Sequence, residues 1–170
     1  MKKLLSILLS AMLLLSLAAC GKQPATTVTS SDLAPVAGVD PTVSIDDAIA
    51  AVGETFTVAV RVEKNPGIIS MKLALQYDNT RLELVETAQQ DFAGVTYGPT
   101  EKVPFIFNWI DAIHPDNTTN GVLTTLTFRV KEGAPAGATP LTLTYDPEDV
   151  FNAAWEGVVF AVRNGSVTIG

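Results

Sequence analysis

The chain has 170 residues, of which 47% are hydrophobic and 17% are charged, and its formal net charge is −7. This length suits one domain with an appendage. An acidic surface repels phosphate groups, which excludes nucleic acid as the expected partner and disfavours adhesion to anionic lipid by charge alone.

The first predicted element is a secretory leader over residues 1–19. Two lysines precede an apolar run (4–17), which is shorter than the roughly 20 residues of a membrane-spanning helix. The leader ends in Leu17-Ala18-Ala19-Cys20, which resembles the lipobox of bacterial lipoproteins, in which the cysteine is diacylated and becomes the first residue. Cys20 is the only cysteine, so it forms no internal disulfide. We expect Cys20 to be the lipidation site of an exported protein anchored to the bacterial membrane.

The next segment, residues 20–41, is predicted to be a flexible tether. It is rich in threonine, serine, alanine, proline and glycine and contains no aromatic residue. Such a composition buries too little apolar surface to offset the entropy of ordering the chain. Residues 42–170 are therefore expected to form the folded domain, held on the extracellular or periplasmic side of the membrane.

Apolar side chains alternate with polar ones along most of residues 42–170, a period typical of strands with one buried face. In the run 122–130, Val122 is expected on the buried side together with Thr124 and Leu126. In the run 103–110 the pattern does not decide which side is buried, because Phe105 and Trp109 alternate with other apolar residues. The predicted strands are 56–62, 69–77, 122–130, 141–145, 158–162 and 167–169, with shorter ones at 42–46, 81–85, 95–98 and 103–110.

Turn signals separate these runs, among them Asn65-Pro66-Gly67, Asn120-Gly121 and Asn164-Gly165. Only residues 45–52 and 147–155 are candidates for a helical turn. Nine or ten short strands with regular turns and almost no helix indicate an all-β domain built as a two-sheet sandwich.

The chain offers few residues for catalysis. A nucleophilic triad requires a base such as histidine beside serine or cysteine, but the single His114 lies in a predicted loop, and the only cysteine is assigned to the anchor. Most acidic residues occupy turns, where aspartate forms local hydrogen bonds. The acidic loop that begins at Asp146 lacks the glycine and the glutamate of a calcium-binding EF-hand loop. We expect no catalytic centre, no metal site and no cofactor.

Aromatic residues support two interpretations. Trp109, Trp155, Tyr97 and Phe92 are candidates for a platform on which sugar rings stack. They are equally the residue types that dominate core burial. In a carbohydrate-binding function, Trp109 and Trp155 are the candidate residues on which a glycan stacks.

Four stretches of the predicted domain follow one another in a characteristic order and spacing, from about residue 43 to the end. The first is Val52-Gly53-Glu54 leading into 56–60. The second is Gly67-Ile68 opening a strand that ends in Tyr77-Asp78, followed by Leu82-Glu83. The third is Gly121-Val122-Leu123, then 128–131 and Ala134-Pro135-Ala136-Gly137, and the fourth is 164–169. In this order and spacing the domain resembles the cohesin family, the β-sandwich modules that capture dockerin domains in cellulosome-type assemblies.

The resemblance implies a jelly roll of about nine strands without a catalytic centre, in which one sheet face binds a small calcium-loaded dockerin. It implies partner contacts from the outward positions of the strand that ends in Tyr77-Asp78, namely Ser70, Lys72, Ala74 and Gln76. The period of two agrees that these four side chains face away from the core. Lys72 departs from the family pattern, because many cohesins carry an acid there, so an acidic partner group is expected to fit better at this position.

The leading functional hypothesis is a non-catalytic cell-surface docking module. Its exposed sheet face binds a dockerin-bearing protein linked to polysaccharide degradation, and lipidated Cys20 holds that protein at the membrane. A carbohydrate-binding module is the first alternative, with polysaccharide as the partner. An envelope lipoprotein with only a structural or solute-capturing role is the second.

Overall fold

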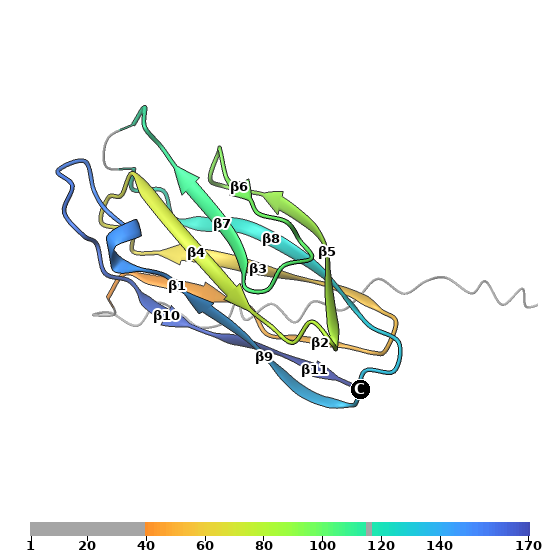
Figure 1. Cartoon of the computed structure of the whole chain (residues 1–170). Helices are drawn as coiled ribbons and strands as arrows, with labels where there is room; N and C mark the ends of the chain where they lie inside the picture. The colour runs from red at the N-terminus through yellow and green to blue at the C-terminus, as the bar shows by residue number, and fades with distance from the viewer. Residues whose placement is uncertain (1–39, 115–116) are drawn as a thin grey trace, which may run out of the picture.

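A computed structural model describes residues 40–114 and 117–170. The predicted leader, Cys20 and residues 21–39 of the predicted tether lie outside the described residues. The described part forms two packed sheets and one short 3₁₀ helix (Figure 1). Its elements are β1 (Thr42–Ile45), β2 (Ala48–Ala50), β3 (Thr55–Glu63), β4 (Ser70–Gln76), β5 (Leu82–Gln89), β6 (Thr96–Tyr97), β7 (Phe105–Ile110), β8 (Gly121–Val130), β9 (Gly137–Thr144), η1 (Pro147–Asp149), β10 (Ala161–Arg163) and β11 (Gly165–Ile169).

The strands form a five-stranded sheet in the order β10-β1-β3-β8-β5 and a six-stranded sheet in the order β2-β11-β9-β4-β7-β6. The predicted all-β, two-sheet sandwich is confirmed. The described residues form eleven strands where about nine were expected, because the chain switches sheets near both ends. The first strand continues in the opposite sheet as β2, and β10 continues there as β11. The terminal strands meet in parallel, β1 with β10 and β2 with β11, and these contacts close the sandwich.

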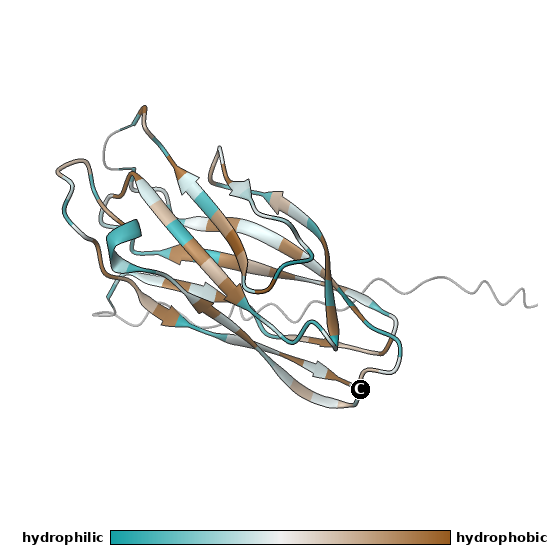
Figure 2. Cartoon of the chain, viewed as in Figure 1, coloured by the Kyte–Doolittle hydropathy of each residue, from teal (hydrophilic) through white to brown (hydrophobic). Residues whose placement is uncertain are grey.

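The core lies between the two sheets and follows the predicted alternation. The inward side chains of β3 and β4, such as Val58 and Leu73, have no exposed surface. Phe128 on β8 stacks on Phe56 with ring centroids 5.7 Å apart and meets the edge of Tyr77 at 5.0 Å. Figure 2 shows hydrophobic and hydrophilic residues alternating along the same strands. Burial of alternate apolar side chains is the main stabilising contribution to this fold.

The structure departs from the predicted burial of side chains in two strands. In β8 the pairing with β3 shifts between Val60 and Arg61, because β8 carries one extra residue there. This β-bulge buries Leu123 and turns Val122 to the outer face, so the prediction that Val122 shares the buried side is wrong. In β10 the predicted inward Val162 is 36% exposed. β10 lies at the edge of its sheet, where the opposite sheet does not cover it fully.

The structure also decides which side of β7 is buried and which of the two candidate segments contains a helical turn. In β7 the buried side is that of Phe105 and Trp109, whereas Ile110 at the strand end is 62% exposed. Of the two candidate helical turns, 147–155 contains η1 but 45–52 contains β2. Within the described ranges no helix has the length and apolar character needed to cross a membrane.

Candidate functional site

The outer face of the six-stranded sheet holds most of the residues predicted to contact a partner. On β4, Lys72 and Gln76 are exposed and Ala74 is half-buried. They lie between β7 and β9, and the register pairs Lys72 with Asn108 and Gln76 with Thr142. Over the six strands, all within the described part of the chain, Lys72 is the only charged residue at an outward position. We call this surface the β4 face; its central outward residues are Lys72, Ala74, Gln76, Ile106, Asn108, Thr142 and Thr144.

Ser70 is the exception among the four predicted contact residues. Its side chain belongs to the same side of β4, but it is only 9% exposed. The segment after η1 covers it: Phe151 forms a bridge with Ser70, and the Ser70 hydroxyl donates a hydrogen bond to the carbonyl of Asp149 at 3.3 Å. The prediction that Ser70 is open to a partner is therefore wrong, because the chain itself already occupies that end of β4.

Lys72 is paired within the chain. Its Nζ donates a hydrogen bond to Oδ2 of Asp149 in η1 at 2.8 Å, and both side chains remain at least 40% exposed. The hydrogen bond and the negative charge of Asp149 raise the pKa of Lys72. The β4 face therefore presents a compensated ion pair, and not the bare cation that the sequence suggests. Asp149 was missed because 77 positions separate the two residues and nothing in the sequence signals their contact.

Trp109 does not belong to any exposed aromatic platform. It is 2% exposed, its Nε1 donates a hydrogen bond to the carbonyl of Ala93 at 3.0 Å, and its ring meets Phe92 edge to face at 5.3 Å. Phe92 is buried as well, and Tyr97 packs against the core. The prediction that Trp109 stacks on a glycan is wrong, because β7 directs it between the sheets.

Trp155 is exposed, as its candidate role requires. Its exposed fraction is 78%, and it stacks on Phe151 with ring centroids 5.1 Å apart and an interplanar angle of 22°. Stacking covers one face of the indole and leaves the other free. The structure does not bring Trp155 together with Trp109, so the glycan-stacking prediction stands on Trp155 alone and remains a prediction.

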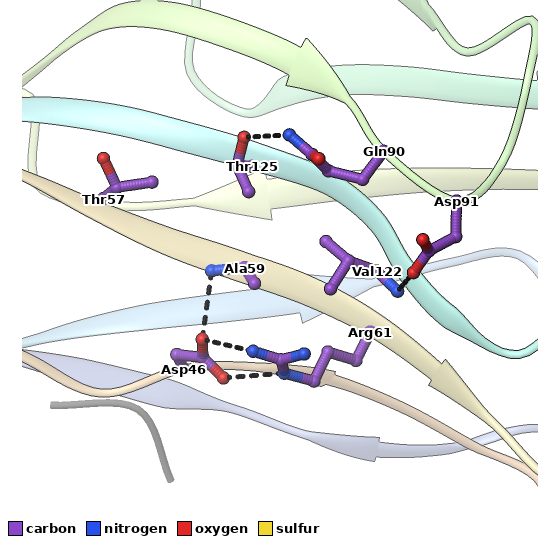
Figure 3. A pocket seen from close by; sticks show the side chains of 8 residues that line it. All are labelled: Asp46, Thr57, Ala59, Arg61, Gln90, Asp91, Val122 and Thr125. Carbon is purple, nitrogen blue, oxygen red and sulfur yellow. Dashed lines mark hydrogen bonds and ion pairs between the residues drawn. The ribbon is translucent and has the colours of Figure 1, made fainter. Parts of the chain in front are cut away.

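A shallow hollow of about 280 Å³ lies on the opposite side of the molecule, on the outer face of the five-stranded sheet (Figure 3). Its two carboxylates are already engaged. Asp46 accepts hydrogen bonds from Arg61 at 3.3 Å and from the backbone of Ala59 at 3.2 Å, and Asp91 accepts one from the backbone of Val122 at 2.6 Å. These bonds fix the loops around β3 and β8, so both carboxylates have a structural role.

The carboxylate of Asp111, in the loop that follows β7, is held by hydrogen bonds within that loop. Asp111 accepts hydrogen bonds from the Asn117 side chain at 2.8 Å and from the backbone of His114 at 3.0 Å. These donors hold the pKa of Asp111 well below its usual range. His114 contacts the same carboxylate through Nδ1. Among the residues that the structure describes, no three histidine, cysteine, aspartate or glutamate side chains lie close enough to hold a metal ion.

Solved structures share the fold of this chain. A non-cellulosomal cohesin from the archaeon Archaeoglobus fulgidus superposes with a TM-score of 0.66 at 23% identity, covering 78% of this chain and 92% of that one. The sixth cohesin of scaffoldin B from Acetivibrio cellulolyticus, solved in complex with a dockerin, gives a TM-score of 0.64 at 23% identity and covers 78% of this chain and 100% of that one. A type I cohesin–dockerin complex from Clostridium thermocellum gives a TM-score of 0.63 at 18% identity, covering 77% of this chain and 99% of that one.

Sequence comparison gives the family. Cellulose-binding protein A of Clostridium cellulovorans is 30% identical over an alignment of 138 residues that covers 75% of this chain, and the chain spans only 7% of the length of that relative. The family model for the cohesin domain matches residues 41–153, a stretch that contains β1 to β9 and η1 and therefore the central outward residues of the β4 face. The chain belongs to the cohesin family.

Proposed function

We propose that the chain is a non-catalytic docking module whose β4 face binds a dockerin-bearing protein. The observation that carries the proposal is the β4 face itself, a broad sheet surface with one ion pair, on a domain of the cohesin family. Several of the similar solved structures are complexes of a cohesin with a dockerin. A flat, largely uncharged strand surface suits recognition of another macromolecule better than enclosure of a small substrate.

The direct test is binding of the full-length chain, purified in detergent, to dockerin modules encoded in the same genome. Calorimetry is expected to give saturable binding of at least one module at one site per chain. A complete absence of binding across the set would contradict the proposed function.

Surface anchoring is a separate part of the proposal, and it rests on the lipobox-like sequence before Cys20. We propose that Cys20 is lipidated, so that the domain is held at the outside of the membrane and the captured partner, a protein of polysaccharide breakdown, is held with it. Metabolic labelling with an alkyne fatty acid is expected to label the wild-type chain and to be lost in Cys20→Ser. Labelling that persists in this variant would contradict the anchor without affecting the docking proposal.

Replacement of Lys72 with aspartate is expected to weaken dockerin binding about tenfold or more. The change replaces the cation of the β4 face with a second carboxylate beside that of Asp149, so an acidic partner group that pairs with Lys72 meets like charge across the interface, which is unfavourable. The melting temperature is expected to change little, because the Lys72–Asp149 pair is exposed and such pairs contribute only about 0–1 kcal/mol. Binding is measured by calorimetry and stability by thermal unfolding.

Arg129→Asp is the matched control for this experiment. Arg129 forms an ion pair of 3.5 Å with Glu83 on the five-stranded sheet, and both side chains are about half exposed, as for Lys72. The control makes the same charge change on the opposite face of the sandwich, so dockerin affinity is expected to be unchanged. A loss of binding in Arg129→Asp together with normal binding in Lys72→Asp would move the site to the five-stranded sheet.

A further inference from the structure

The half-buried Phe151 and the exposed Trp155 form an aromatic pair at one end of the β4 face; we call this pair the aromatic corner. The bridge between Phe151 and Ser70 sets the pair beside the first residue of β4, and Ser70 is itself paired with Ile110 on β7. Ile110 is 62% exposed and Trp155 is 78% exposed. In Figure 1 the loop between η1 and β10 and the loop that follows β7 lie at the same end of the sandwich. The aromatic corner thus extends the β4 face with apolar surface.

The position of Trp155 is fixed before any partner arrives. Its backbone has φ of +62°, a left-handed conformation that bulky residues adopt only under constraint. Asn152 supplies the constraint: its carbonyl accepts a hydrogen bond from the Trp155 backbone at 3.0 Å, and its side-chain oxygen accepts from Ala154 at 2.9 Å and Glu156 at 3.0 Å. The stack on Phe151 fixes the indole further. A rigid exposed aromatic ring loses little entropy on binding, which is typical of interface hot spots.

Burial does not account for this arrangement. An indole that is 78% exposed contributes little to the core, yet the turn holds it in a strained backbone conformation. Strain that folding does not require is a pointer to function.

The surroundings of the indole select the chemistry of the partner group. The loop between β9 and β10 contains four acidic residues and no basic one, namely Asp146, Glu148, Asp149 and Glu156. Only Asp149 among them is paired with a cation in the described structure, through Lys72. Trp155 belongs to this acidic loop and Glu156 follows it directly, so the negative charge of the loop attracts a cation that can lie over the exposed ring. The same charge disfavours contact with anionic lipid.

We propose that the aromatic corner is part of the docking face and that the free face of Trp155 receives an arginine or lysine side chain of the dockerin-type partner. This inference rests on the proposed function and adds to it a specificity-determining residue outside the strands of the β4 face.

Tryptophan fluorescence gives a direct readout, because the chain has only two tryptophans and Trp109 is buried. Acrylamide quenching of the full-length chain in detergent therefore reports mainly on Trp155. The probe is a dockerin module that binds in calorimetry, with any tryptophan of its own replaced by phenylalanine. Saturation with this module is expected to protect Trp155 from acrylamide.

Trp155→Ala is expected to weaken binding of the same module about tenfold, whereas Trp155→Phe, which keeps an aromatic face, retains most of the affinity. Val85→Ala is the matched control; Val85 is an exposed apolar residue on β5 of the opposite sheet, and the affinity is expected to be unchanged. On the partner, replacement of one exposed arginine or lysine is expected to weaken binding to the wild-type chain but not to Trp155→Ala.

Other outcomes overturn the inference. If the module binds but Trp155 stays fully quenched and Trp155→Ala binds normally, the aromatic corner is not part of the site, although the docking function stands. If cello-oligosaccharides protect Trp155 and the module does not, the corner binds glycan. If vesicles of phosphatidylglycerol protect it and the module does not, the corner contacts membrane. If no module binds at all, the docking function itself fails and this inference fails with it.

Discussion

Replacement of Trp109 with alanine is expected to lower the free energy of unfolding by about 3–5 kcal/mol, the usual cost of removing a large buried aromatic side chain. Trp109 is 2% exposed and packs against Phe92 on the inner side of β7. The substitution leaves a cavity between the sheets and also removes the donor to the Ala93 carbonyl. Urea unfolding of the purified chain, followed by far-ultraviolet circular dichroism, measures the change.

Trp155→Ala is the matched comparison, since it removes the same side chain from an exposed site. Exposed substitutions usually change stability by less than about 0.5 kcal/mol, so the two tryptophan variants are expected to separate clearly. Any loss of partner binding in Trp109→Ala is then attributed to unfolding. Equal stability of the two variants would show that Trp109 lies outside the core.

The contrast between the two tryptophans shows what the sequence can decide. The alternation of Phe105 and Trp109 with other apolar residues predicts a strand, yet it does not tell which side is buried when both sides are apolar. The decision comes from the opposite sheet, which covers only one side. The β-bulge in β8 is a similar case: it inserts Leu123 and moves Val122 outward, and a regular period of two does not predict such an insertion.

The candidate site was predictable to the extent that it depends on a single strand. The period of two places Lys72, Ala74 and Gln76 outward, and the structure places them there. Ser70 and Lys72 differ from expectation because η1 and Phe151, from a distant part of the chain, lie against the same strand. Long-range contacts of this kind depend on how the crossover between β9 and β10 packs against the sheet. The local alternation of apolar and polar residues does not specify this packing.

The closure of the sandwich at its terminal strands depends on a glycine. Gly165 begins β11 just after the chain leaves β10, and it is buried against the segment in which the first strand leaves its own sheet. A Cβ atom at Gly165 would clash with the carbonyl oxygen of Asp46 and would lie 2.7 Å from that of Ile45. Beside this contact, Asp47 accepts hydrogen bonds from the backbone and hydroxyl of Ser166 at 2.7 and 2.9 Å.

Gly165→Ala is therefore expected to lower the free energy of unfolding by about 3 kcal/mol, at the upper end of the usual cost of overpacking. Both atoms that the new methyl group meets are backbone carbonyl oxygens, which cannot rotate away as a side chain does. Gly157→Ala is the control, because its nearest neighbour, the carbonyl oxygen of Pro147, is at an ordinary distance of 3.7 Å. Urea unfolding of both variants tests the argument. Equal stability of the two would mean that the strand crossing relaxes, and that β1, β2, β10 and β11 do not close the sandwich as a tightly packed unit.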